Sequence, residues 1–456
     1  MYELLIKNGS IPNFGSRQME IADVAISGGK IVEVGKIDKE AETTIDATGK
    51  IVSPGFIDLH MHEEDFCNEG KKPIVSKLML NMGVTTCVGG NCGVQYQGIE
   101  DFKSGIESLG GMPTNYLMLS GYNYFREKQG IGRYDLASQE VIDKIIEEIN
   151  FELTNGAYGV SFGIEYDPGI TFQEIVRVLE NVEDKAFVSM HYREDSAGSM
   201  DAVSEMINIA ETTKQRFQIS HLSSCSAMGQ MDEALNMISE AINKNERLGF
   251  DTYPYNAFST EIGSAVFDDG CFERWGKSYD AILITDGKYK GQYCTKEIFE
   301  EVRRESPNML VVAFVMNEEE IQGAIVDKNS IIASDGIMKN GSGHPRVAGT
   351  FPRLLGKYVR EEKCISMIDA IEKITKIPAK RLELMGKGEI KLNYDGDITI
   401  FDPNEIIDLA TFEDGTKAPK GIDMVIVNGK IAKDKENIIN STLGKFIASE
   451  FTKDNN

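Results

Sequence analysis

The chain has 456 residues, of which 41% are hydrophobic, and a formal net charge of −24. This length suits two or three domains, although a single α/β barrel can take up roughly 250 residues or more. The acidic balance argues against nucleic acids and anionic membrane surfaces as partners, because both repel a negatively charged protein.

The seven cysteines, at positions 67, 87, 92, 225, 271, 294 and 364, are widely scattered. An odd, dispersed set is not a disulfide framework and favours a reducing compartment. Residues 1–7 lack the charged and apolar regions of a signal peptide, and there is no apolar run of about 18 residues, the length of a membrane span. We therefore expect a cytoplasmic protein without a membrane-spanning segment.

Short strands separated by glycine, asparagine and proline are predicted at both ends of the chain. The segments Ile6-Lys7-Asn8-Gly9 and Val427-Asn428-Gly429-Lys430 resemble each other, which indicates that the two ends pair. We expect residues 1–53 and 386–445 to form one small β-sandwich. The predicted strands are 2–7, 21–27, 30–34, 43–46, 396–402 and 424–430.

Between these ends, eight apolar strand-like runs alternate with helical segments such as 139–154, 171–182, 202–213 and 231–245. This pattern predicts an α/β protein with a (β/α)₈ barrel over residues 54–385, whose active site lies where the strands end. The long gap at 256–329 predicts an insertion that covers or walls the site, and residues 445–456 are expected to begin as a helix. The eight predicted barrel strands are 56–62, 84–90, 116–121, 159–164, 186–191, 217–221, 249–253 and 330–334.

Side chains that can bind a metal gather at the predicted strand ends. Two histidines at i and i+2 on the first strand face the same side, and later strands add further donors. Imidazole, thiolate and carboxylate together suit zinc. Because the donors come from separate strands and not from close cysteine pairs, we expect a catalytic metal site, which keeps a position open for water. The donors are His60, His62, Cys92, His191, His221 and Asp335.

Asp335, at the end of the eighth strand, has three open interpretations: a metal ligand, a general base that passes a proton from water to a leaving amine, or both. As an alternative to all three, Asp335 and Gly336 form an ordinary surface turn without a role in the site. Tyr253 and Tyr255, at the end of the seventh strand, are candidate substrate contacts, since buried tyrosine hydroxyls need a partner. Arg346 is a further candidate, unless it only orders its loop by binding backbone carbonyls.

The chain resembles the amidohydrolase superfamily, and within it most closely the N-acyl-D-amino-acid deacylases, or D-aminoacylases. The motif at 54–62, Pro-Gly-Phe-Ile-Asp-Leu-His-Met-His, is shared across the superfamily. The Asn-Cys-Gly motif at 91–93, and the His-Pro-Arg at 344–346 that precedes Phe-Pro-Arg at 351–353, are more specific to this branch. The resemblance extends over nearly the whole chain and implies a metal-dependent hydrolase of non-peptide C–N bonds.

The resemblance also implies roles for individual residues. Asp335 matches the branch's general base. Many superfamily members bridge two metals with a carbamylated lysine on the fourth strand, but residues 156–164 contain no lysine. The matches to the branch's tight zinc site are Cys92, His191 and His221. The matches to a second, weaker or vacant site are His60, His62 and Asp335.

One departure concerns the substrate. The deacylases generally place a lysine, which meets the substrate's α-carboxylate, where this chain has Ser223, and the insertion offers Arg274 as its main cation. The expected small-molecule substrate is therefore an N-acyl-D-amino acid or a close relative, with a cyclic amide, a lactone or a dipeptide-like compound as the alternative. An inactive relative that serves in binding or assembly is a remote third hypothesis. The number of subunits, a homo-oligomer included, is left open.

Overall fold

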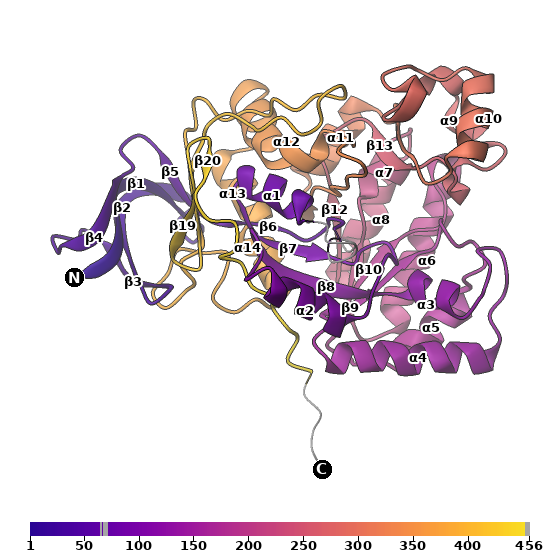
Figure 1. Cartoon of the computed structure of the whole chain (residues 1–456), viewed down its shortest axis with the longest axis horizontal. Coiled ribbons are helices and arrows are strands. Elements are labelled where there is room, and N and C mark those ends of the chain that lie inside the picture. The colour runs from indigo at the N-terminus through magenta and orange to yellow at the C-terminus, as the bar shows by residue number, and fades with distance from the viewer. Residues whose placement is uncertain (64–65, 67–71, 452–456) are drawn as a thin grey trace, which may run out of the picture.

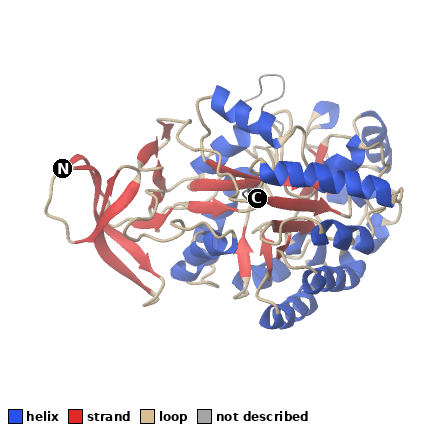
Figure 2. Cartoon of the chain, turned by 90° about the horizontal axis from the view of Figure 1, so that it is seen from below, coloured by secondary structure: helices blue, strands red, loops and turns tan. Residues whose placement is uncertain are grey.

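Eight parallel strands in the middle of the chain form the barrel that the sequence predicts, which confirms the α/β fold class. The computed structural model, which describes residues 1–63, 66 and 72–451, orders them β6 to β12 and then β16 (Figures 1 and 2). The barrel closes where Asp335 N–H donates to His60 O at 2.8 Å and His62 N–H donates to Gly336 O at 2.9 Å. The strands are β6 (Phe56–Asp58), β7 (Val84–Gly89), β8 (Asn115–Gly121), β9 (Gly159–Gly163), β10 (Phe187–His191), β11 (Arg216–Ile219), β12 (Leu248–Thr252) and β16 (Ser330–Ile332).

Helices connect these strands and cover the barrel from outside (Figure 2). The sequence of α4 explains both its start and its packing. Ser138 accepts a hydrogen bond from Val141 N–H and caps the helix, and isoleucines at positions 142, 145, 146 and 149 bury one face. The helices are α1 (Ile74–Asn81), α2 (Ile99–Ser108), α3 (Tyr122–Lys128), α4 (Gln139–Thr154), α5 (Phe172–Glu180), α6 (Ser199–Thr212), α7 (Leu222–Ser226), α8 (Met231–Lys244), α11 (Glu318–Val326), α12 (Arg346–Arg353), α13 (Met367–Ile374) and α14 (Lys376–Arg381).

The two ends of the chain meet in one nine-stranded sheet beside the barrel, at the left of Figure 1, as the sequence predicts. β5 pairs with β17 in antiparallel register, Pro54 opposite Ile398. Apolar side chains from both ends share one core, among them Ile6, Val52 and Ile400. The exact domain limits, 1–53, 54–385 and 386–445, stay a prediction. The strands are β1 (Tyr2–Asn13), β2 (Gln18–Ser27), β3 (Lys30–Gly35), β4 (Ala41–Asp46), β5 (Ile51–Pro54), β17 (Ile398–Phe401), β18 (Ile422–Val427), β19 (Lys430–Asp434) and β20 (Asn437–Ile438).

The chain between β12 and β16 builds a small unit with its own three-stranded sheet, ordered β13-β15-β14. It occupies the range of the predicted insertion, and its β13 supplies one wall of the cavity at the barrel rim. The elements of this unit are β13 (Phe258–Glu261), α9 (Cys271–Trp275), β14 (Ile282–Ile284), α10 (Lys296–Glu305) and β15 (Leu310–Ala313).

The helix expected at the C-terminal end is wrong for residues 445–451, which run extended against the barrel, while 452–456 lie outside the described residues. Tyr116 N–H donates to Lys445 O at 2.9 Å, and Ile447 N–H donates to Tyr116 O at 2.8 Å. Pairing with the start of β8 satisfies these backbone groups, so tertiary contacts override the local helical preference.

The six described cysteines are free, in agreement with the absence of a disulfide framework, and Cys67 lies outside the described residues. Within the part of the chain that the structure describes, we find no helix with the length and apolar character needed to cross a bilayer.

Candidate metal centre and active site

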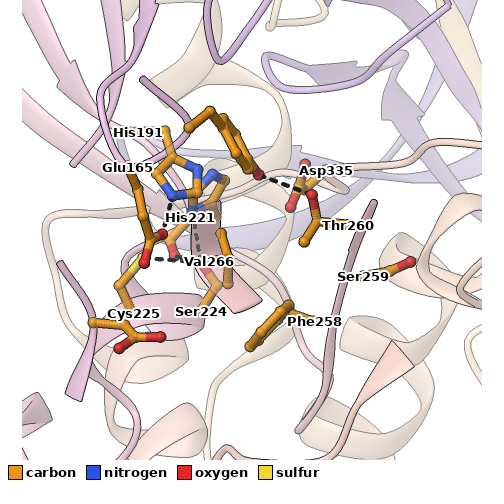
Figure 3. A pocket seen from close by; sticks show the side chains of 12 residues that line it. Glu165, His191, His221, Ser224, Cys225, Phe258, Ser259, Thr260, Val266 and Asp335 are labelled. Carbon is orange, nitrogen blue, oxygen red and sulfur yellow. Dashed lines mark hydrogen bonds and ion pairs between the residues drawn. The ribbon is translucent and has the colours of Figure 1, made fainter. Parts of the chain in front are cut away.

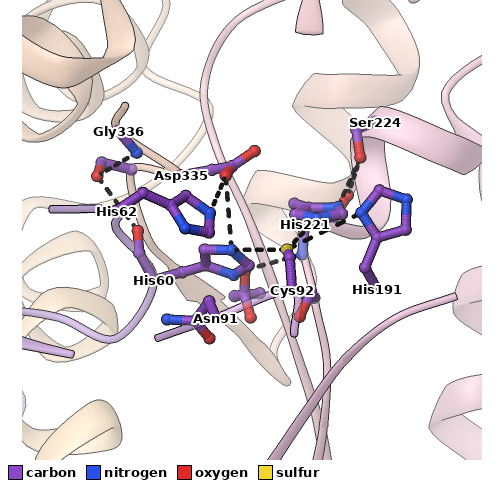
Figure 4. Close-up of polar contacts among 12 residues, drawn as sticks. His60, His62, Asn91, Cys92, His191, His221, Ser224, Asp335 and Gly336 are labelled. Carbon is purple, nitrogen blue, oxygen red and sulfur yellow. Dashed lines mark hydrogen bonds and ion pairs between the residues drawn. The ribbon is translucent and has the colours of Figure 1, made fainter. Parts of the chain in front are cut away.

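The predicted donors converge at the C-terminal rim of the barrel, around the thiol of Cys92 (Figure 4). Its Sγ lies 3.4 Å from His60 Nε2, 3.5 Å from His221 Nε2 and 3.9 Å from His191 Nδ1. Asp335 Oδ1 lies 3.5 Å from His60 Nε2 and 3.4 Å from His62 Nε2. All six donors therefore face one small volume, although they come from strands far apart in the sequence.

These spacings fit a divalent metal. A tetrahedral zinc with bonds of about 2.3 Å to sulfur and about 2.1 Å to nitrogen holds those two atoms roughly 3.6 Å apart. Cys92 belongs to two donor triads whose atoms lie within 4.8 Å of one another, one with His191 and His221 and the other with His60 and His62. The residues present can thus hold one metal or two that share Cys92.

Three residues of this cluster have a left-handed backbone, which non-glycine residues adopt at a cost of about 1–3 kcal/mol each. Cys92 has φ 54°, His221 φ 33° and Asp335 φ 49°. At Gly163, at the end of β9, an added Cβ would come within 2.3 Å of Cys92 O, so only glycine lets the Cys92 loop approach. Strain at three strand ends that meet is typical of a functional site.

The electrostatics favour ionised donors. Burial raises the pKa of the Cys92 thiol, but the charge of His60 and hydrogen bonds with His191 and His221 outweigh it and hold that pKa well below its ordinary value. Burial also raises the pKa of Asp335, and the Arg346 guanidinium 2.9 Å away is the main cause that brings it well below its usual range. A thiolate and a carboxylate are the forms that bind a metal.

The outer nitrogens of the two central histidines are held by partners that the sequence analysis missed. His191 Nε2 lies 2.6 Å from Glu165 Oε2, and His221 Nδ1 lies 2.6 Å from Ser224 Oγ. Each contact turns the other ring nitrogen toward Cys92, as such partners do in metal sites. Glu165 lies two residues beyond the end of β9, so the rule that site residues sit at strand ends could have found it.

Replacing Glu165 with glutamine should therefore weaken metal binding by about 10- to 100-fold, because the ring of His191 loses its charged acceptor. Titration of the metal-free protein against a chromophoric chelator measures this. Glu180→Gln, at an exposed position of α5, is the matched control and should bind metal like the unaltered chain. Equal metal affinity in both variants would assign Glu165 no positioning role.

A cavity opens beside the donor cluster, between the barrel rim and the inserted unit (Figure 3). His191, His221 and Asp335 form its metal-facing side. Cys225 also lines it, and its thiol groups with Glu165 and His191 in a donor triad that the sequence analysis did not foresee. The remaining lining residues are Glu165, Tyr166, Asp195, Ser224, Phe258, Ser259, Thr260 and Val266.

The three predicted substrate contacts are all buried. Arg346 Nη2 donates to the lining residue Ser259, at its backbone O, at 3.1 Å, and its guanidinium lies 4.7 Å from the ring centroid of Tyr253. The Tyr255 hydroxyl donates to Asp408 Oδ2 at 3.2 Å. Neither tyrosine is among the lining residues, and substrate contact by the three stays a prediction.

Comparison with known proteins gives a consistent result. Residues 329–432 match a model of the Amidohydrolase family. A D-aminoacylase of Alcaligenes xylosoxydans xylosoxydans is 26% identical over 98% of both chains, and an N-acyl-D-aspartate deacylase of the same organism is 26% identical over 95% of this chain and 92% of its own. The crystal structure of the N-acyl-D-glutamate deacylase of Bordetella bronchiseptica, with zinc and a phosphonate inhibitor, superposes with a TM-score of 0.87 at 25% identity, covering 98% of this chain and 100% of that one.

A closed (β/α)₈ barrel with histidine, cysteine and aspartate donors at its C-terminal rim defines a metal-dependent hydrolase that acts on a small molecule. Over nearly its full length the chain is similar to D-aminoacylases and N-acyl-D-amino-acid deacylases, and these similarities support a hydrolase of C–N bonds other than peptide bonds.

Proposed function

We propose that the protein removes the acyl group of an N-acyl-D-amino acid with the help of zinc, giving a carboxylate and a free amine. The observation that supports this most directly is the position of Asp335. Its carboxylate contacts His60 and His62, lines the cavity and pairs with Arg346. It thus stands between the donor cluster and the place where a substrate can enter.

Zinc fits the donors Cys92, His191 and His221, with a second and weaker site at His60, His62 and Asp335. When bound, it supplies Lewis-acid activation of the attacking water and of the scissile carbonyl. Asp335 then acts as the general base that accepts the proton of this water and delivers it to the departing nitrogen. Its low pKa, caused mainly by Arg346 against the opposing effect of burial, keeps it ionised, which is the form that a base needs.

The missing lysine also has an explanation in the proposed site. Ser223 is fully buried and its hydroxyl hydrogen-bonds with Thr252, so this position offers the substrate no cation. Arg346 Nε and Nη1, and the hydroxyl of Ser259, have no hydrogen-bond partner within the described part of the chain. Asp335, 2.9 Å from Nη2, already balances the charge of this guanidinium, but its two unpartnered buried nitrogens still need an acceptor, and we assign them the substrate's α-carboxylate.

A panel of N-acetyl-D-amino acids and their L-enantiomers tests this function on the zinc-loaded protein. We expect kcat/KM to be at least about 100-fold higher for the D series, because inverting the α-carbon would exchange the positions of the side chain and the hydrogen while Arg346 and the metal fix the carboxylate and the carbonyl in the proposed site. Turnover of a ring amide or lactone but of no N-acyl-D-amino acid would instead support the cyclic substrate that the serine at position 223 suggests.

The same proposal places the enzyme in the cytoplasm. The buried thiol of Cys92 must stay reduced to bind a metal, and the other described cysteines are also free. Zinc content of the purified protein, measured by elemental analysis, should be close to one tightly held ion per chain, since three donors share the site around Cys92.

A further inference from the structure

We propose that the substrate carries a single carboxylate, so that the D-amino acid it releases has a neutral side chain and is neither aspartate nor glutamate. This inference rests on the proposed function and specifies its substrate class. The relatives include deacylases of N-acyl-D-aspartate and N-acyl-D-glutamate at the same 26% identity, so overall similarity does not decide the point. The residues that line the cavity distinguish between an acidic and a neutral side chain.

The wall that the inserted unit contributes is partly apolar. Phe258 on β13 and Val266 shortly after it line the cavity and are 6% and 3% exposed. The ring of Phe258 packs in turn against Phe267 and Trp275, with centroids 6.1 Å and 5.8 Å away. This packing fixes the apolar wall in place, and a hydrocarbon side chain gains free energy by burial against it.

The charged residues of the cavity already have partners. Glu165 is bound to His191. Asp195 accepts hydrogen bonds from Arg274 Nε and, at 2.6 Å, from Trp275 Nε1. Arg274, the insertion's candidate for a substrate carboxylate, is therefore paired with a buried aspartate, and its Nη2 donates to Val266 O at 3.4 Å. Arg346 is also paired, with Asp335, but within the described chain it keeps two buried nitrogens without an acceptor.

Among the described residues, those that line the cavity include no lysine or arginine. Arg346, just behind Ser259 and Asp335, is the cation with unpartnered donors at this place in the described part of the chain, and one substrate carboxylate satisfies it. A second carboxylate would be buried against Phe258, Val266 and the three acidic side chains that line the cavity, which are Glu165, Asp195 and Asp335. Burial of an uncompensated charge is strongly unfavourable.

The test compares N-acetyl-D-methionine with N-acetyl-D-aspartate and N-acetyl-D-glutamate on the zinc-loaded full chain. We expect kcat/KM for the methionine substrate to exceed both acidic ones by at least about 100-fold. Acidic substrates that react equally well or better would overturn the inference while leaving the deacylase function intact. Absence of turnover with all three would instead reject the deacylase function on which the inference rests.

Two variants probe the cause. Asp195→Asn releases the charge of Arg274 and should raise the ratio of kcat/KM for N-acetyl-D-glutamate over N-acetyl-D-methionine by at least about tenfold. Thr260→Lys, at a half-buried lining position of β13, adds a cation directly and should move the ratio the same way even if Asp195→Asn does not fold. Asp201→Asn, exposed on α6, is the control and should leave it unchanged. An unchanged ratio in both folded lining variants would contradict the assignment of specificity to this wall.

Discussion

Replacing Asp335 with asparagine is expected to lower kcat by about 100- to 10,000-fold while zinc stays bound. Asparagine has nearly the same shape but cannot accept a proton from the attacking water, and general-base catalysis contributes this range of rate. The proposed tight site at Cys92, His191 and His221 does not include the Asp335 oxygens, so its metal should remain. The measurement is kcat with the favoured N-acetyl-D-amino acid, together with zinc content after dialysis.

A control separates the loss of the base from a general loss of structure. Asp232→Asn, exposed in the first turn of α8, removes a carboxylate far from the rim and should keep full activity. Near-normal turnover by Asp335→Asn would refute the role of this aspartate as base. Loss of zinc along with activity would show that it acts mainly as a ligand.

Much of this site could be predicted from the sequence, because the parallel strands of a barrel deliver their last residues to one rim. His191 ends β10, and His60, Cys92, His221 and Asp335 lie a few residues beyond the ends of β6, β7, β11 and β16. The rule needs only the strand assignments and residues whose side chains bind metals. It brought six donors together without any knowledge of how the strands pack.

Residues that act through a neighbour were harder to predict. Ser224 and Cys225 follow His221 in the short helix α7, and only the left-handed turn at His221 brings the Ser224 hydroxyl back to its ring. The tail at 445–451 was mispredicted because its backbone partners, at the start of β8, lie more than 300 residues earlier in the chain. Such contacts depend on tertiary structure, which local periodicity does not encode.

The chain offers a sharp test of which thiol holds the metal, because two buried cysteines lie beside the same histidines. Cys92→Ser should lower zinc affinity by more than about 100-fold and abolish turnover, since the shared donor of both triads is lost. Cys225→Ser is the matched comparison: the Cys225 thiol contacts His191 and His221 from the cavity side but is not in the proposed ligand set, so metal affinity should fall far less than in Cys92→Ser.

Cobalt substitution gives the readout that activity alone cannot. A thiolate bound to Co²⁺ produces an intense charge-transfer absorption, so the band should vanish in Cys92→Ser and persist in Cys225→Ser. Removing the metal with a chelator should abolish turnover in the unaltered chain, and adding zinc back should restore it. The opposite pattern, with the band lost only in Cys225→Ser, would assign the tightly bound metal to the donors Glu165, His191 and Cys225.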